Sequence, residues 1–435
     1  MSLVTAVLGC SGKRPVELDS LPEGDAPTAH ELEATIAADE YHAALVEAER
    51  ILEDDDLHAY LQERADEIVA ARGLEPGSIR VFVVKNPFMN AGVFPNGIVH
   101  LHTGILARIE NEAQLVTLLG HEIGHHALRH VAREELSRER EASRVAWERF
   151  ALAMVLAPTG LSPLAYMDLG AKGMDGVLAK QMSGYSRAFE HEADRYGFEV
   201  MRDAGYPLEQ SAAFFQRLIV VEEATGAEPN VAKEADDPYV YASHPALTAR
   251  KASYTSLIAE GHCACANGDA PTEGCFAPAT SEDPAHEARY MAHVESAVLD
   301  AARADRAIGR RQAALAILER LLAFQTESAE GWELLGAIRS ARGSRSEEIP
   351  EAIAALERAA EIAPERPVVH RELGLLYRKP DRPQAAAASF RAYLEVEPEA
   401  RDAKIIRRFI DEALAVEAPE SFGEEVLRKS AEENE

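Results

Sequence analysis

The sequence predicts an α+β fold that is mostly α-helical, with a small β-sheet in its first part and an all-α solenoid at its C-terminal end. Three observations lead to this prediction. Apolar residues recur at helical spacing over long stretches, only short β-branched runs interrupt them, and the composition after about residue 284 shifts to a self-similar Ala-, Leu-, Glu- and Arg-rich pattern. At 435 residues the chain also exceeds the usual size of one hydrophobic core, so we expect more than one domain.

The individual elements follow from apolar spacing and from the residues that start and stop helices. Helices are expected over residues 30–73 (as a pair), 111–128, 183–204 and 208–225. Strands are expected over residues 80–85 and 97–102, which are β-branched and bounded by turn residues. Asn111, followed by Gln114 three positions later, predicts a capped start for its helix.

Composition limits the class of partner. Hydrophobic residues make up 47% and charged residues 27% of the chain, as in globular proteins. The formal net charge of -29 opposes the phosphates of nucleic acids and anionic lipid surfaces, so we expect no nucleic-acid partner. The longest apolar candidate, residues 150–157, falls short of a membrane span, so contact with a membrane is expected only through an N-terminal lipid anchor.

The C-terminal third contains an internal repeat. Two sets of residues recur in the same order: Trp332, Leu335, Gly336, Ala352, Leu356 and Pro364, then His370, Leu373, Gly374, Ala386, Phe390 and Pro398. This spacing resembles the tetratricopeptide pattern, with a short insertion around residues 343–350 and a degenerate repeat before both. Such repeats imply a solenoid whose groove recruits a protein partner.

The predicted helix over residues 111–128 is apolar nearly all round and is therefore expected to be buried. Buried polar groups are costly unless they are paired. His121 and His125 lie one helical turn apart on the same face, where they can share one tetrahedral zinc ion, and Glu122 lies beside them. The H-E-x-x-H pattern also arises by chance, so its context must decide.

That context is a second helix carrying the segment Ser186 to Asp194. With the preceding motif it resembles the HtpX-like and BepA-like zinc metallopeptidases, gluzincins related to the CAAX prenyl endopeptidases. The resemblance implies a zincin-like metallopeptidase domain, one Zn²⁺ per chain and Glu190 as the third ligand. Glu122 would then act as general base on a zinc-bound water that attacks a peptide carbonyl.

Three further residues near the predicted ligands, Asp194, His126 and His130, can be given roles from their positions on the helices. Asp194 shares a helix face with Glu190, whereas Glu192 points away, so the carboxylate of Asp194 could orient a zinc-bound histidine from its outer nitrogen. A structural ion pair with Arg187 or Arg195 fits the same position. His126 and His130 lie on a rotated face and are interpreted as bystanders.

The family resemblance extends to two loops. Ser243-His244-Pro245 followed by Arg250 is similar to a segment near the metal, which implies that His244 and Arg250 cap the zinc or stabilise the oxyanion; an ordinary loop histidine fits equally. Residues 90–97 resemble a segment leading to an edge strand along the cleft, where a substrate could pair. Its candidate residues are Val93, Phe94, Asn96 and Gly97, and a plain hairpin loop explains them as well.

The four cysteines fall in two places. Val7-Leu8-Gly9-Cys10 resembles the lipobox of bacterial lipoproteins, which implies lipidation of Cys10, although a plain N-terminal tail fits the segment equally. Cys263, Cys265 and Cys275 lie close together without a paired C-x-x-C, which favours one disulfide using Cys275 over a metal knuckle.

Four regions are expected. These are a lipobox and linker over residues 1–24, a metallopeptidase domain over 25–284 with a cysteine-containing insertion at 261–284, repeats over 285–416 and an acidic tail over 417–435. The resemblance implies a periplasmic endopeptidase in quality control that acts on unfolded or misassembled cell-envelope proteins. The alternative is a chaperone or adaptor that works through its repeats and has a self-inhibited zinc site.

Overall fold

The structure is a computed structural model that describes residues 29–133, 187–225, 247–265, 284–341, 346–378 and 382–415. Its contacts divide the chain into two compact units, Met1–Ala313 and Ala314–Glu435, which we describe separately. The predicted fold class is confirmed, because the described residues are mostly helical with one small sheet. None of their helices combines the length and apolar character needed to cross a membrane.

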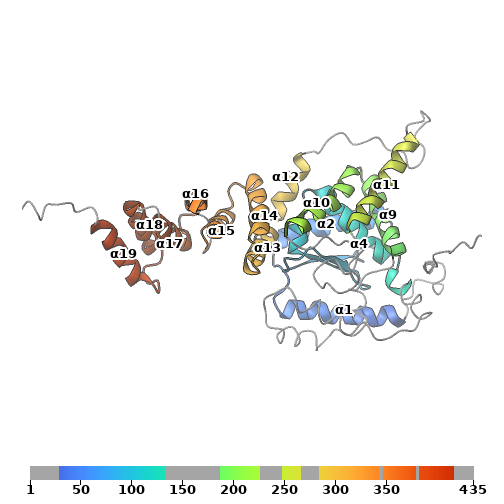
Figure 1. Ribbon diagram of the computed structural model, residues 1–435. Helices are drawn as coiled ribbons and strands as arrows, with labels where there is room; N and C mark the ends of the chain where they lie inside the picture. The colour runs from blue at the N-terminus through green and yellow to red at the C-terminus, as the bar shows by residue number, and fades with distance from the viewer. Residues whose placement is uncertain are drawn as a thin grey trace, which may run out of the picture. The chain divides into compact units, whose positions relative to one another are not determined.

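The first unit contains one sheet and a set of helices around it (Figure 1). Its strands are β1 (Arg80–Val84), β2 (Ala91–Val93) and β3 (Ile98–His102). Its helices in the described ranges are α1 (Ala29–Glu47), α2 (Asp55–Ala71), α3 (Thr103–Leu106), α4 (Glu112–Ala127), α9 (Arg187–Asp203), α10 (Glu209–Thr225), α11 (Leu247–Cys265), α12 (Pro284–His293) and α13 (Glu295–Ala307). The predicted strands and helices of this region are thus confirmed, with boundaries that shift by a few residues.

The sheet has the order β1-β3-β2, with β1 parallel and β2 antiparallel to the central β3. Helix α1 covers one face, where Ala37 and Ala38 pack against Phe94 and Ile98. Helices α2 and α4 cover the opposite face (Figure 1). Because both faces are covered, four of the five residues of β3 are buried.

Helix α4 runs through the centre of this unit. The Asn111 side chain accepts a hydrogen bond from the backbone nitrogen of Gln114 at 3.0 Å, which confirms the predicted cap. Every residue from Glu112 to His125 is buried. The helix ends at Ala127, and Arg129 then takes a φ of 50°, so the chain changes direction before His130.

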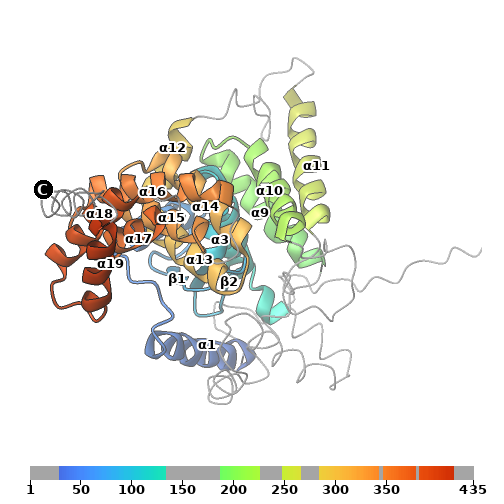
Figure 2. The same ribbon diagram turned by 60° about the vertical axis from the view of Figure 1, so that its left-hand side comes forward.

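Helix α9 packs on α4. Helix α11 lies beside α9 and α10 (Figure 2). At the crossing of α4 and α9, Gly120 and Gly197 meet, and a Cβ built on Gly120 would lie 3.0 Å from the Gly197 Cα. The absence of side chains at both positions lets the two backbones approach closely. Polar residues on the facing sides of α4 and α9 are thereby brought within bonding distance.

Helices α12 and α13 pack against the turn that follows β3. The Tyr290 hydroxyl donates to the Leu106 carbonyl at 2.6 Å, and the Thr103 hydroxyl donates to Asp300 at 2.8 Å. Arg108 and Asp305 form a buried ion pair at 2.6 Å. The compact unit accordingly extends to Ala313 and includes two helices that the sequence groups with the repeats.

The second unit consists of helix pairs. Its elements are α14 (Arg311–Phe324, which begins just before the unit boundary), α15 (Ala329–Arg339), η2 (Ser346–Glu348), α16 (Ile349–Ile362), α17 (Pro367–Tyr377), α18 (Pro383–Val396) and α19 (Ala403–Ala415). Helix α15 packs on α16 and α17 on α18. A Cβ built on Gly336 would lie 2.6 Å from Leu356, and one on Gly374 2.4 Å from Phe390. The same glycine-to-large-residue contact recurs in both repeats, which explains the matched positions in the sequence.

Candidate metal centre

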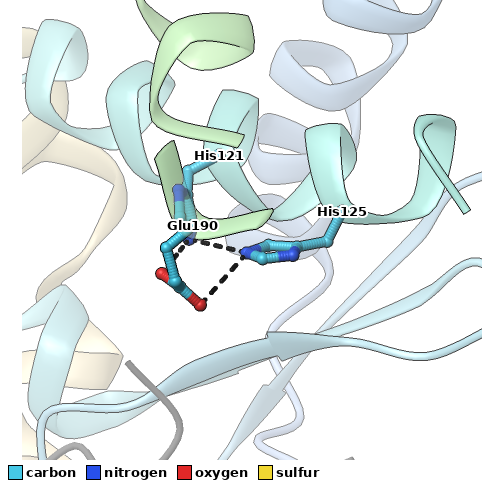
Figure 3. A group of neighbouring side chains, drawn as sticks. All are labelled: His121, His125 and Glu190. Atoms are coloured by element: carbon cyan, nitrogen blue, oxygen red, sulfur yellow. Dashed lines mark hydrogen bonds and ion pairs between the residues drawn. The ribbon is translucent and has the colours of Figure 1, made fainter. Parts of the chain in front are cut away.

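Three buried side chains converge where α4 and α9 cross (Figure 3). The Nε2 atoms of His121 and His125 are 3.0 Å apart. The Glu190 carboxylate lies 3.6 Å from each of them, through Oε2 to His121 and Oε1 to His125. Within the described residues this is the one group of three or more side chains that could hold a metal ion.

The geometry fits zinc. Four ligands arranged tetrahedrally at about 2.0–2.1 Å from zinc lie about 3.3 Å from one another. The shortest separations are 3.0, 3.6 and 3.6 Å, the last two to different oxygens of Glu190, and one ligand atom from each residue lies within 4.8 Å of the others. Two histidine nitrogens and one carboxylate also form the ligand set of catalytic zinc sites that keep a fourth position open. The side chains present therefore form a ligand set that suits a zinc ion.

The outer nitrogen of His121 faces a buried ion pair. His121 Nδ1 lies 3.0 Å from the Asp194 carboxylate. The guanidinium of Arg250, from α11, reaches the same Asp194 oxygen through Nη2 at 2.6 Å and lies 2.8 Å from His121 Nδ1. Burial disfavours the charged form of Arg250, but Asp194 and Glu190 outweigh it and raise the pKa of Arg250. Asp194 thus forms a buried ion pair with Arg250.

The outer nitrogen of His125 has a different partner. His125 Nδ1 lies 2.8 Å from His130 Nδ1, and His130 Nε2 lies 3.4 Å from Glu192. Arg133 binds both Glu192 oxygens, at 2.7 and 3.1 Å. Burial by itself raises the pKa of Glu192, but the hydrogen bonds to His130 and Arg133 outweigh it and lower that pKa to about 2. Sequence periodicity did not find His130, because the chain leaves the register of α4 at Arg129.

Glu122 lies beside these ligands on α4 and is 2% exposed. It occupies the position between the two histidines of the motif, one residue after His121. His126, on the other side of His125, hydrogen-bonds the backbone of Phe94, and burial lowers its pKa. Helix α4 therefore contributes His121 and His125 to the site with Glu122 buried beside them in the sequence, while His126 connects the same helix to the end of β2.

The residues of the expected substrate edge divide between a strand and a turn. Val93 ends β2, which is the outer strand of the sheet beside α4. Phe94 and Gly97 close the turn to β3, with the Gly97 nitrogen donating to the Phe94 carbonyl at 2.9 Å. Asn96 donates to Asp39 of α1 at 2.7 Å. Only Val93 of the four belongs to the strand itself.

Several predicted residues cannot be placed. Cys10, His244, Cys275 and the tail over residues 417–435 lie outside the described residues, as do the side chains of Cys263 and Cys265. Arg250, grouped with His244 in the sequence, is described, and its guanidinium lies on the Asp194 and His121 side of the centre.

A buried His-His-Glu set held by an H-E-x-x-H helix and a second crossing helix defines the metallopeptidase class. Comparison with known proteins agrees with this class. Residues 53–257 match the profile of Peptidase family M48, and residues 340–411 match a tetratricopeptide repeat profile. The chain thus contains a Peptidase family M48 domain, followed by C-terminal tetratricopeptide repeats.

The chain is also similar in sequence to parts of several curated proteases. The chain is 30% identical to the beta-barrel assembly-enhancing protease of Yersinia pestis over 165 residues, which are 37% of this chain and 32% of that protein. It is 26% identical to the beta-barrel assembly-enhancing protease of Escherichia coli (strain K12) over 184 residues, covering 42% and 36%. It is 33% identical to the mitochondrial metalloendopeptidase OMA1 of Bos taurus over 150 residues, covering 34% and 27%. The matched region spans well under half the length of each of these relatives.

Proposed function

We propose that this protein is a zinc-dependent endopeptidase that hydrolyses peptide bonds in unfolded or misassembled cell-envelope proteins. The observation that carries the proposal is the convergence of His121, His125 and Glu190 at distances that suit tetrahedral zinc, next to the buried Glu122. Hydrolysis of a peptide bond requires a polarised carbonyl and a base for the attacking water, and this set offers both.

In the proposed mechanism, a bound zinc ion supplies Lewis-acid polarisation and lowers the pKa of water at its open position. Glu122 accepts a proton from the attacking water and returns it to the leaving amine. Its burial at 2% exposure keeps competing solvent away from that carboxylate. The motif leaves Glu122 as the carboxylate adjacent to the ligands on α4, since Glu190 is engaged with both histidines.

Asp194 and Arg250 orient His121 in this proposal. With His121 using Nε2 toward the metal, its proton resides on Nδ1, where the Asp194 oxygen at 3.0 Å accepts it. Arg250 Nη2, which is also a donor, then hydrogen-bonds Asp194 and not the nearby Nδ1. Arg250 binds the same Asp194 oxygen through Nη2 at 2.6 Å and through Nε at 3.1 Å. The proposed role of Arg250 is therefore to fix Asp194, which leaves the capping role to His244 alone.

The proposed substrate and location are supported by the similar proteins and by the repeats, and not by the geometry of the metal centre. Two relatives are named for enhancing beta-barrel assembly, which supports a substrate among envelope proteins and a periplasmic location. The tetratricopeptide repeats support recruitment of a substrate or protein partner through their groove. The outer strand β2 would let an extended segment pair by its backbone, with little demand on its sequence. Lipidation at Cys10 would supply a membrane anchor.

The proposal is tested by digestion of an unfolded protein such as reduced, carboxymethylated lactalbumin with the zinc-loaded chain. Cleavage is expected in the wild type and a loss of about 10²- to 10⁴-fold in Glu122→Gln, with zinc still bound at one per chain. Glu199→Gln, a matched change of a partly exposed residue on α9, serves as control and should cleave normally.

If the protein is a chaperone or adaptor instead, the opposite result of this experiment is expected. A chaperone would suppress aggregation of the same unfolded protein equally well in the wild type and in Glu122→Gln, with no cleavage in either. Cleavage that persists in Glu122→Gln would instead assign the general base to another residue.

A further inference from the structure

His125 and His130 form a direct contact between two buried imidazoles. Their Nδ1 atoms are 2.8 Å apart, and their ring planes are inclined by 76° with centroids 4.8 Å apart. Both side chains are buried, at 1% and 0% exposure. A contact this short between two ring nitrogens requires one ring to donate and the other to accept.

The direction of that hydrogen bond follows from the metal-facing side. His125 presents Nε2 to His121 and Glu190, so the ring proton of a neutral His125 resides on Nδ1. His130 Nδ1 must then be the acceptor, and the proton of His130 must reside on Nε2. That Nε2 faces the Glu192 carboxylate at 3.4 Å, which is an acceptor. The pattern of donors and acceptors is consistent at every step from His125 to Glu192.

The position of His130 is fixed from several sides. Its ring stacks on Phe189 with centroids 4.7 Å apart and planes inclined by 18°. Arg133 holds Glu192 by two bonds and also lies over the Phe189 ring at 4.5 Å. Since the chain turns at Arg129, His130 comes back toward His125 instead of continuing the face of α4.

We propose that His130 is a positioning residue of the metal centre, which accepts the hydrogen bond from His125 and, with Glu192 and Arg133, fixes that ring for zinc binding through Nε2. This inference rests on the zinc centre of the proposed function. It gives the two histidine ligands parallel support, because His121 is held by Asp194 and Arg250 in the same way. Helix α9 would then contribute three alternate carboxylates with three roles: Glu190 as ligand, Glu192 toward His130 and Asp194 toward His121.

Two substitutions at His130 separate hydrogen bonding from packing. His130→Phe keeps a flat ring to stack on Phe189 but has no acceptor for His125. His130→Asn gives up the ring but places its side-chain oxygen where Nδ1 stood, so it can still accept. Zinc affinity of the full-length chain is measured by competition with a chromogenic chelator, and the ligand field by the visible absorption of the cobalt-substituted protein.

We expect His130→Phe to weaken zinc binding by about 10- to 100-fold and to change the cobalt spectrum. His130→Asn should recover most of the affinity and the wild-type spectrum. His126→Phe, at a neighbouring half-buried histidine that bonds to the backbone of Phe94, is the matched control and should bind zinc normally. Far-ultraviolet circular dichroism in the presence of chelator checks that each variant is folded.

Wild-type zinc affinity in His130→Phe, or equal losses in His130→Phe and His130→Asn, would overturn the proposal. The first outcome would show that His125 needs no acceptor, and the second that packing alone matters. A wild-type chain that takes up no zinc would overturn the metal centre itself. Zinc binding without cleavage would contradict the proposed function and leave the role of His130 standing.

Discussion

Gly197 of α9 packs directly against Gly120 of α4, with no room for a methyl group between the two helices. A Cβ built on Gly197 would lie 2.9 Å from the His121 backbone nitrogen and 3.2 Å from the Gly120 carbonyl carbon. These neighbours are backbone atoms, which cannot rotate away as a side chain can. The contact therefore sets the distance between the helix that carries both histidines and the helix that carries Glu190.

Gly197→Ala is expected to push α4 and α9 apart. We predict a loss of about 1–3 kcal/mol in the free energy of unfolding, typical of overpacking, together with weaker zinc binding because Glu190 moves away from His121. Gly92→Ala is the control, since a Cβ at Gly92 meets nothing within 4 Å. Urea denaturation of the metal-free protein and chelator competition measure the two effects, and a Gly197→Ala chain with unchanged zinc affinity would contradict the link.

Asp194→Asn should be costly in two ways. Arg250 would keep its charge in a buried place without a carboxylate partner, and such losses cost about 3–5 kcal/mol. His121 would lose its charged acceptor, so zinc affinity should fall by about 10- to 100-fold. The control is Asp203→Asn near the exposed end of the same helix, expected within about 0.5 kcal/mol of the wild type. Equal stability of the two variants would refute this account.

Much of the centre could be predicted because it depends on local spacing. The turn-to-turn distance in a helix places His121 beside His125, and the side chain of Asn111 caps the helix that carries them. Glu190 required a family resemblance as well, because no local rule brings one helix to another. Its placement depends on Gly120 and Gly197 at the crossing of α4 and α9. Nothing in the local sequence distinguishes these two glycines from others in helices.

The contacts of His130 and Arg250 could not be predicted from local sequence spacing. Helical periodicity turned His130 away from the site, but the positive φ of Arg129 interrupts that periodicity and returns the ring to His125. Arg250 lies 129 residues beyond His121, and only packing of α11 on α9 brings its guanidinium to Asp194. Backbone irregularity and long-range packing leave no spacing pattern that a sequence can display.

Acid should destabilise the metal-free protein through the histidines of β3. Burial, aided by His42, lowers the pKa of His100 to about 3, and burial lowers that of His102 to about 4 despite a hydrogen bond with the Phe88 backbone. Unfolded histidine titrates near 6.5, so between pH 6.5 and about 4 the unfolded chain binds protons that the folded chain does not. The contribution of these two histidines to the free energy of unfolding is fully present above pH 6.5 and is lost as the pH falls toward about 4.

The free energy of unfolding is expected to change with pH by at most about 1.4 kcal/mol per pH unit for each of these histidines. Urea denaturation between pH 7 and pH 5, with chelator present throughout, measures it. His100→Gln should flatten the dependence, because glutamine keeps a polar group toward His42 but does not titrate in this range. An unchanged slope in His100→Gln would assign the acid sensitivity to other groups.

Truncation can decide which unit α12 and α13 belong to. A chain that ends at residue 284, the boundary suggested by composition, would leave the Leu106 carbonyl without Tyr290 and the buried Arg108 without Asp305. We expect it to melt well below a chain that ends at residue 313, which keeps both contacts, because breaking one buried ion pair alone costs about 3–5 kcal/mol. Asp305→Asn in the longer chain should reproduce part of that loss. Equal melting temperatures for the two truncated chains would mean that the two helices add nothing to the peptidase unit and are structurally the start of the repeats.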